Sequence, residues 1–300
     1  MGKEYDIVII GAGMAGLTAA IYAVRAGKKV AVLERNAYGG QIITSTKIAN
    51  YPGVPGVSGL ELMKGVYEQA KKLGAEILDE EAEVVDFSSE VKKIETDEGE
   101  ILAKTVIIAT GSHEKALGLP DEEKFTGHGI SYCATCDGGF YKGKPVAVVG
   151  GGNTALYDAL YLSEIASKVY IVHRRNEFRG QPFLVEKLRE KENVEFVMES
   201  KPVRYIGEEK ISGLEVEGPE EKRALDVAGI FVAIGRVPAT EIFTELNKDE
   251  GGYIEAGEDC HTSVEGVFVA GDCRTKTLRQ LVTASSDGAM AATEAVHYLK

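Results

Sequence analysis

Two stretches of the chain repeat one pattern: a short apolar run, a glycine-rich turn, a helical segment and a second apolar run. In the first, "YDIVII" precedes the turn at residues 11–16, and a helical segment to about Ala26 leads into "KVAVLE". In the second, "PVAVVG" leads into the turn at residues 150–155, and a helix to about Ala166 leads into "KVYIVHRR". Continuous apolar runs are typical of parallel strands that are buried on both faces. The pattern therefore predicts two βαβ units.

Both turns have the spacing of a dinucleotide-binding fingerprint. Glycines there let the backbone turn tightly and approach a pyrophosphate, which the free N–H groups at the start of the following helix bind. An isolated match is weak, but here each turn follows an apolar strand and opens a helix. The residues concerned are Gly11, Gly13 and Gly16 in the first unit and Gly150, Gly152, Asn153, Thr154 and Ala155 in the second.

The residue that ends the second strand of each unit distinguishes two kinds of nucleotide. Glu34 lies 23 positions after Gly11, and a carboxylate there accepts hydrogen bonds from a ribose 2′-OH, as in FAD or NAD. In the second unit the same count leads to a basic run suited to a 2′-phosphate, as in NADPH. That run comprises His173, Arg174, Arg175 and, further on, Arg179. The alternatives are a solvated strand-end charge at Glu34 and an ordinary basic loop in the second unit.

Two dinucleotide sites, one of them selective for a phosphorylated nucleotide, indicate a flavoprotein that takes electrons from NADPH. The apolar segments 103–111 and 227–236 each close one unit, and the strand in "GVFVAGDC", which has no fingerprint of its own, is expected to return to the first unit. We therefore predict an α/β fold with two Rossmann-like, three-layer dinucleotide-binding domains, the second inserted into the first. The expected division is residues 1–116 and 243–300 for FAD, and 117–242 for NADPH.

Composition limits the partners of the chain. A length of 300 residues favours two domains. A net charge of −13 disfavours nucleic acid and anionic membranes as partners, because both would repel the protein. The uncharged run "IVIIGAGMAGLTAAIYAV" has three glycines at its centre, with Glu4 and Asp6 ahead of it, so a soluble chain is expected rather than a membrane span or signal peptide. Four cysteines are too few for a secreted disulfide scaffold and favour a cytoplasmic protein.

Two of the cysteines form a Cys-x-x-Cys motif, "CATC", at Cys133 and Cys136. Such a pair can be half of a zinc site, a redox pair or two inert core residues. Zinc needs two more ligands, and the candidates Cys260, His261 and Cys273 form no second knuckle, so no metal is expected. Polar residues and glycines follow the motif instead of an apolar strand, which disfavours an inert pair. The redox interpretation is favoured.

The residue after the motif supports redox chemistry. A thiolate, and not a thiol, attacks a disulfide, and a neighbouring cysteine in this spacing lowers the thiol pKa. The Asp137 carboxylate could carry the proton that each dithiol must gain or lose. The alternative for Asp137 is a turn residue ahead of Gly138 and Gly139.

By these features the chain resembles a known family, the low-molecular-weight thioredoxin reductases of bacteria, archaea and plants. The likeness covers essentially the whole chain and is carried by motifs in the family's order: "GAGMAGLTAAIYAVRAG", "GGQIITSTKIANYPG", "CATCDG", "VVGGGNTA", "VHRRNEFR" and "GVFVAGDCRTKTLRQLVTASSDG". The resemblance implies reduction by NADPH of the disulfide of thioredoxin or a thioredoxin/glutaredoxin-like protein, through FAD and a Cys133–Cys136 redox disulfide. It also implies a homodimer.

The resemblance implies residue roles as well. Cys136 would face the flavin, Cys133 would attack the partner's disulfide, and Asp137 would be the general acid. On local grounds Asp272, at a strand end, suits a sugar or ribityl hydroxyl, with a turn cap as the alternative. The family often has Asp-Ser where this chain has Asn153-Thr154; the pyrophosphate site still fits, but the resemblance does not extend to the nicotinamide-side contacts. The expected FAD-binding residues are Gly11, Gly13, Gly16, Glu34, Gly40, Gln41, Asn50, Gly111, Gly271, Asp272, Arg279 and Gln280.

Alternative functions stay open at this point. A dithiol oxidase that passes electrons to oxygen, or a ferredoxin-linked enzyme of the same fold, would have no use for a 2′-phosphate site. A flavin-bearing redox sensor that does not turn over is a third possibility. Because the thiols and the predicted NADPH site lie in one domain, we expect that domain to rotate during turnover on connections near residues 114–118 and 240–245.

Overall fold

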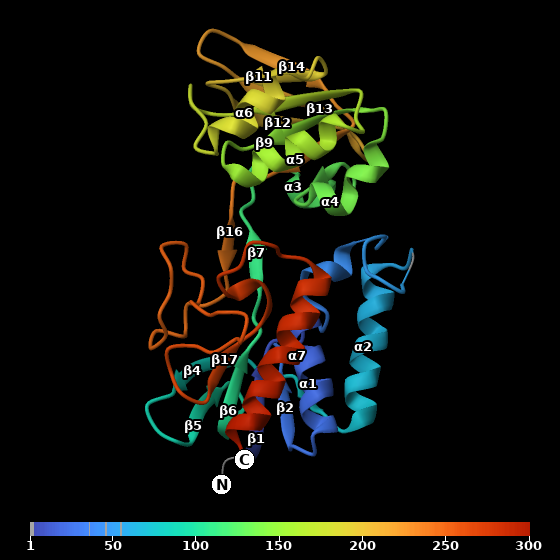
Figure 1. The fold of residues 1–300 in the computed structure, drawn as a ribbon. Coiled ribbons are helices and arrows are strands. Elements are labelled where there is room, and N and C mark those ends of the chain that lie inside the picture. Colours follow the sequence, from blue (N-terminus) through green and yellow to red (C-terminus); the bar gives the residue numbers. More distant parts are fainter. Residues whose placement is uncertain (1–2, 36, 46, 55) are drawn as a thin grey trace. The chain divides into compact units, whose positions relative to one another are not determined.

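The computed structural model describes residues 3–35, 37–45, 47–54 and 56–300, drawn as a ribbon in Figure 1. The chain forms two compact units. One unit combines residues Met1–His113 and Val237–Lys300, and the other is Glu114–Arg236. The second unit is therefore a continuous insertion between the two segments of the first unit.

A seven-stranded sheet, counted over the described residues, forms the centre of the first unit. Its order is β3-β2-β1-β6-β5-β4, and β17 pairs in parallel with β6. The strands β1, β2, β3, β6 and β17 are mutually parallel, and the hairpin β4–β5 adds an antiparallel extension. The bounds are β1 Lys3–Ile10, β2 Val30–Leu33, β3 Glu76–Leu78, β4 Ala82–Asp86, β5 Lys92–Thr96, β6 Gly99–Ile108 and β17 Val267–Val269.

Helices α1 (Met14–Arg25), α2 (Gly59–Leu73) and α7 (Leu281–Tyr298) lie side by side in this unit (Figure 1). They share one hydrophobic core with Ile7 and Ile9 of β1, while Val8 of the same strand packs into a second core on the other face. Successive side chains of a strand point to opposite faces. Both faces of β1 are therefore buried, which explains its continuous apolar sequence. Two short 3-10 helices, η1 (Gly40–Thr44) and η3 (Gly271–Cys273), lie in loops of the unit.

The second unit contains a five-stranded parallel sheet with the order β11-β10-β9-β15-β8 in the described chain. Val146 and Val148 of β9 pack into a core shared with helices α5 and α6, and Ala147 and Val149 pack into a core shared with an antiparallel sheet, β12-β13-β14. The unit thus has three layers. The strands are β8 Ile130–Ser131, β9 Pro145–Val149, β10 Lys168–Val172, β11 Val194–Val197, β12 Lys201–Gly207, β13 Ile211–Glu217, β14 Lys222–Asp226 and β15 Gly229–Val232. The helices are α3 Glu122–Phe125, α4 Ala134–Asp137, η2 Gly138–Tyr141, α5 Asn153–Ser163 and α6 Pro182–Arg189.

The two passages of the chain between the units pair with each other. Strands β7 (Ser112–Glu114) and β16 (Arg236–Pro238) form a two-stranded sheet. The Lys115 N–H donates to the Gly235 carbonyl at 3.0 Å, and the Arg236 guanidinium forms a 2.8 Å ion pair with Glu114. The connections near this point are therefore hydrogen-bonded strands and not free linkers.

In the part of the chain that the structure describes, no helix is both long and apolar enough to cross a membrane. Within the same residues no group of three or more His, Cys, Asp or Glu side chains is arranged to hold a metal ion.

Candidate functional site: two nucleotide turns and a disulfide

The first glycine turn is held tightly between β1 and α1. Gly11 has φ +107°, and a Cβ on it would lie 2.5 Å from the Ala109 carbonyl oxygen; a Cβ on Gly16 would overlap the Gly11 carbonyl. In contrast, among the residues that the structure describes, no atom lies within 4 Å of a Cβ position on Gly13, the N-cap of α1, and no side chain caps the helix. Helix N–H groups without a side-chain cap suit a pyrophosphate. The turn therefore fits the phosphates of a dinucleotide.

Glu34 is fixed beside this turn. Its carboxylate accepts a hydrogen bond from the Ala12 N–H at 2.8 Å, which places the acidic strand-end residue next to the glycines. Gly40 lies there too, since a Cβ on it would be 3.6 Å from the Cα of Gly13. Sequence positions that are well separated thus meet at one end of the sheet.

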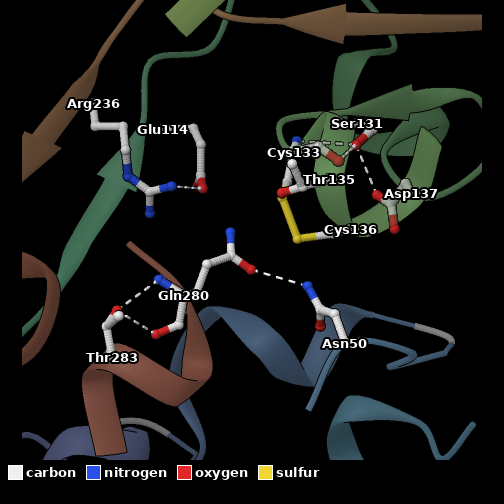
Figure 2. Close-up of a disulfide and its surroundings, with 10 residues drawn as sticks. All are labelled: Asn50, Glu114, Ser131, Cys133, Thr135, Cys136, Asp137, Arg236, Gln280 and Thr283. Atoms are coloured by element: carbon white, nitrogen blue, oxygen red, sulfur yellow. Dashed lines mark hydrogen bonds and ion pairs between the residues drawn. A yellow bond between two sulfur atoms is a disulfide. The ribbon is translucent and has the colours of Figure 1, made fainter. Parts of the chain in front are cut away.

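The predicted flavin-side residues near the chain end are linked to one another. Arg279 donates to the backbone carbonyl of Asp272 at 3.3 Å, and its guanidinium lies 4.1 Å from the centre of the Tyr253 ring. The Gln280 side chain accepts from the Asn50 amide at 3.0 Å (Figure 2), and it also caps α7 by accepting from the Thr283 N–H. Gln41 and Gly111 lie in η1 and after β6. The first unit therefore gathers polar groups from three separate segments.

A buried ion cluster supports the Gly271–Asp272 turn. Asp287 accepts hydrogen bonds from the Gly271 N–H (2.9 Å), from Arg274 (2.8 and 2.9 Å) and from Lys276 (2.7 Å). The Arg274, Lys276 and Asp287 side chains are 3%, 5% and 5% exposed. Burial raises the pKa of Asp287, but the bonds from Arg274 and Lys276 outweigh it and hold the pKa below its ordinary value. In sequence the cluster is not evident, because Arg274 and Lys276 closely follow "GDC" whereas Asp287 lies 11 positions beyond Lys276.

The second glycine turn, in the inserted unit, is bordered by arginines. A Cβ on Gly152, the N-cap of α5, would meet no atom of the described chain within 4 Å, and no side chain in that part of the chain caps the helix. The N–H groups of Arg179 and Gly180 donate to the Gly151 carbonyl at 2.8 and 3.1 Å, which folds the arginine loop back onto the turn. The side chains of Arg174, Arg175 and Arg179 are exposed. The turn therefore presents uncapped N–H groups beside cationic side chains.

His173 lies differently from these arginines. It is buried beneath Gly151, stacks on Phe178 with ring centres 5.2 Å apart, and has Nε2 3.1 Å from the Glu177 carbonyl. Burial, with the nearby arginine charges, lowers its pKa below the ordinary value. A neutral ring that donates from Nε2 fits these contacts. His173 thus supports the turn from below, because Gly151 leaves room for the ring.

Cys133 and Cys136 form a disulfide with their Cα atoms 5.3 Å apart. Cys133 is the N-cap of the one-turn helix α4, which also contains Cys136 and Asp137. The Asp137 carboxylate accepts a 2.7 Å hydrogen bond from Ser131 at the end of β8 (Figure 2). Burial raises the pKa of Asp137, and the bond from Ser131 partly offsets this. The bonded sulfurs agree with the redox interpretation of the motif.

The disulfide and the second nucleotide turn lie at the same edge of one sheet, each just after the end of a parallel strand. Strand β8 runs into the disulfide segment and β9 runs into Gly150, and both are parallel to β15, which lies between them. Carboxyl ends of parallel strands share an edge, and two strand spacings are about 10 Å. The redox pair and the arginine-bordered turn are therefore neighbours within one unit.

The remaining cysteines, Cys260 and Cys273, are buried and not bonded to each other. Burial raises the pKa of Cys260 to about 12 and also raises that of Cys273. Their sulfurs lie 3.6 Å from the Asp287 carbonyl and 3.4 Å from the Ala270 carbonyl, respectively. These thiols behave as core residues.

The fold and these sites define a class of protein. Residues 5–288 match the family described as "Pyridine nucleotide-disulphide oxidoreductase", and the chain belongs to this family.

Several members of this family are similar to the chain over nearly its whole length. A thioredoxin reductase of Bacillus subtilis (strain 168) is 42% identical over 305 aligned positions, covering 99% of this chain and 96% of that protein. The crystal structure of thioredoxin reductase from Streptococcus pyogenes MGAS5005 matches with a TM-score of 0.94 at 38% identity, covering 100% of this chain and 99% of that one. A ferredoxin-flavin thioredoxin reductase from Clostridium acetobutylicum is 33% identical, with a TM-score of 0.55 and 100% and 99% coverage. The predicted family resemblance and the predicted fold, two Rossmann-like domains with the second inserted into the first, are confirmed. Family membership implies FAD and NADPH as cofactors.

Proposed function

We propose that this protein is an NADPH-dependent, FAD-containing reductase of the disulfide in thioredoxin or a thioredoxin/glutaredoxin-like protein. The observation that carries the proposal is the Cys133–Cys136 disulfide at the same sheet edge as an arginine-bordered nucleotide turn. The curated relatives are named thioredoxin reductases, which supports the same substrate for this chain. We also propose a cytoplasmic homodimer.

The discontinuous unit is proposed to bind FAD and the inserted unit NADPH, with the division at residues 1–116 and 243–300 against 117–242. The two compact units support this division. The uncapped start of α1, with Glu34 beside it, suits the FAD pyrophosphate and ribose. When bound, FAD supplies a two-electron relay between the nicotinamide and the disulfide.

In the inserted unit, the uncapped start of α5 would bind the NADPH pyrophosphate, and Arg174, Arg175 and Arg179 would bind the 2′-phosphate. Exposed guanidinium groups are available for charge-assisted, bidentate bonds to a phosphate. We propose that His173 acts on this site from below, by supporting the loop that carries the arginines.

The two cysteines are proposed to have separate roles. In the reduced protein, the Cys133 thiolate attacks one sulfur of the partner's disulfide, and the other partner sulfur leaves and takes a proton from the Asp137 carboxyl. The Cys136 thiol then attacks the Cys133 sulfur and returns its proton to Asp137, which re-forms the Cys133–Cys136 disulfide and releases the second partner sulfur to take a proton from solvent. Two electrons pass to the partner, and its disulfide becomes a dithiol.

A ferredoxin-linked enzyme is the second candidate, because the relative from Clostridium acetobutylicum carries that description. The arginines bordering the second turn count against it, since ferredoxin has no 2′-phosphate to bind.

An anaerobic titration of the purified protein tests the proposal. NADPH is expected to bleach the bound flavin stoichiometrically, whereas NADH bleaches it only at much higher concentration. Oxidised thioredoxin added next should restore the flavin absorbance and sustain NADPH oxidation. A preparation that retains no flavin, or whose flavin responds to reduced ferredoxin and not to NADPH, contradicts the proposed function.

A further inference from the structure

Ser131 joins both ends of the disulfide segment. Its hydroxyl donates to the Asp137 carboxylate at 2.7 Å and lies 3.3 Å from the Cys133 carbonyl, and its oxygen accepts from the Cys133 N–H at 3.1 Å (Figure 2). The side chain is 5% exposed. One small buried hydroxyl therefore contacts the peptide of one cysteine and the carboxyl that follows the other.

The strand that carries Ser131 is itself fixed. Ser131 pairs with Phe231 of β15 in the parallel sheet. The next residue, Tyr132, points its hydroxyl to Glu122 at 2.9 Å, and the carboxylate of Glu122 also accepts the N–H groups of residues 117–119. Neighbouring side chains of an extended segment point to opposite sides. The segment from residue 131 to residue 133 is thus held on both sides, and Ser131 has little freedom to move.

We propose that Ser131 is a positioning residue for thiol–disulfide exchange: its hydroxyl holds the carboxyl of Asp137, the residue after Cys136, in one orientation. The inference rests on the proposed function, in which Asp137 gives and regains a proton. A carboxyl that follows a single turn of helix can rotate away, and general acid catalysis requires it within hydrogen-bond reach of the leaving sulfur. The Ser131 bond selects the rotamer in which the carboxyl meets the Ser131 hydroxyl, which itself accepts from the Cys133 N–H.

The same bond also acts on the pKa of the carboxyl, against the larger effect of burial. Burial raises the pKa of Asp137, and the hydrogen bond from Ser131, which stabilises the ionised form, lowers it. Loss of the hydroxyl should therefore raise the pKa of Asp137 further. The neighbouring elements bring other ionisable side chains: Tyr141 on η2, and Tyr157, Asp158 and Tyr161 on α5, which packs against α4.

Asp158, on the neighbouring helix α5, could contribute its own ionisation to the pH profile of activity. Burial raises its pKa to about 7, so it titrates in the range in which activity would be measured. Burial, with the charge of Asp137 adding to it, raises the pKa of Tyr141 above its ordinary value.

The test compares Ser131→Ala, Ser131→Thr, Asp137→Asn and the double variant Ser131→Ala/Asp137→Asn in the FAD-loaded full chain. Ser163→Ala is the matched control, because Ser163 is a buried serine of the same unit whose hydroxyl bonds to the Leu160 carbonyl. Thioredoxin reduction is followed from pH 5 to 9, and flavin reduction by NADPH is measured separately by stopped flow. Asp158→Asn is profiled in parallel.

Ser131→Ala should lower the rate of thioredoxin reduction roughly 10-fold, the usual order for a hydrogen bond to a charged group. It should also move the limb of the pH profile that depends on Asp137 to higher pH. Ser131→Thr should restore the wild-type limb, and Ser163→Ala should match wild type. Flavin reduction by NADPH should stay unchanged throughout, and the double variant should equal Asp137→Asn.

The results distinguish failure of the Ser131 inference from failure of the proposed function. Full turnover by Asp137→Asn would show that the proposed role of Asp137 is wrong, and the inference fails with it. If Asp137→Asn is impaired, three results overturn the Ser131 inference alone: an unshifted profile in Ser131→Ala, a further 10-fold loss in the double variant, or a limb that disappears in Asp158→Asn.

Discussion

Removal of the charge of Asp287 is the sharpest test of how the first unit is held together. Asp287→Asn leaves Arg274 and Lys276, whose side chains are 3% and 5% exposed, without a buried anion. Four hydrogen bonds end on this carboxylate, including the one from the Gly271 N–H. An asparagine has one acceptor oxygen and cannot serve all four donors. Breaking a buried ion pair by removing one partner costs about 3–5 kcal/mol. Because the amide retains part of the bonding, we expect a loss of about 3 kcal/mol, or roughly a 100-fold rise in the unfolding constant.

Urea unfolding of the FAD-loaded protein, at one protein concentration for all variants and without added free FAD, measures this loss. The chain contains no tryptophan, so flavin fluorescence, which rises on release, can report the first unit while circular dichroism reports the whole chain. The matched control is Glu186→Gln, which removes an exposed ion pair with Arg189 (side chains 66% and 64% exposed). Exposed pairs contribute about 0–1 kcal/mol, so this control should unfold almost as the wild type does.

The pH dependence adds a second readout. The pKa of Asp287 in the folded protein lies below its ordinary value of 3.8. The stabilisation is therefore fully present above the unfolded pKa and is lost as the pH falls through the folded one. The stability difference between wild type and Asp287→Asn should be constant at neutral pH and shrink below about pH 4. Asp287→Asn that is no less stable than Glu186→Gln, or a stability difference that persists unchanged in acid, would show that the buried ion cluster does not stabilise the first unit.

Three further predictions concern the inserted unit. Cys136→Ser should abolish thioredoxin reduction and leave flavin reduction by NADPH intact in stopped flow; survival of both half-reactions would remove the redox role of the pair. Arg175→Ala should raise the KM for NADPH roughly 10-fold or more and leave that for NADH unchanged, because the lost bond is charge-assisted; equal effects on both nucleotides would contradict a 2′-phosphate site. Glu122→Gln should destabilise the inserted unit by about 2 kcal/mol in urea, since its buried carboxylate accepts the Tyr132 hydroxyl and three backbone N–H groups. Tyr132→Phe, which leaves the three backbone bonds in place, should cost less, and the reverse order would contradict this account.

The main strands and helices could be predicted because their signals are local. The apolar run of β1 has both faces buried, so it shows no alternation, and the glycines of the following turn mark where the helix begins. The antiparallel sheet β12-β13-β14 had no such signal. Its outer strands carry many exposed residues, as in β14, where Leu225 alone is buried. A strand with one exposed face and no glycine fingerprint resembles a loop in sequence.

Some residues of the candidate site could likewise be located from the sequence, and others could not. Glu34 and the arginines after β10 could be located because the length of a βαβ unit fixes where its second strand ends. His173 occupies the same strand end, but its ring lies beneath Gly151 and stacks on Phe178. This orientation depends on packing with Gly151 and Phe178, so the position in the sequence alone did not predict it. Asp287 was missed because its partners, Arg274 and Gly271, lie in a separate loop. Charged residues that come together only in the folded protein have no fixed spacing in the sequence by which they could be recognised.

The sheet edge of the inserted unit imposes a constraint on turnover. The disulfide and the second nucleotide turn are fixed to strands two positions apart in one rigid parallel sheet, so neither can approach a substrate independently of the other. Both must reach the same flavin ring, which we propose belongs to the other unit. We therefore propose that the inserted unit rotates on its two connections between half-reactions, so that each group meets the ring in turn. The chain passes between the units at the paired strands β7 and β16, which adjoin the predicted connection near residues 114–118 and lie a few residues before the one near 240–245; the Glu114–Arg236 ion pair lies beside them. A covalent crosslink that fixes one arrangement should stop steady-state turnover and leave one half-reaction at its normal rate. Full activity in the crosslinked protein would show that both reactions proceed from one arrangement.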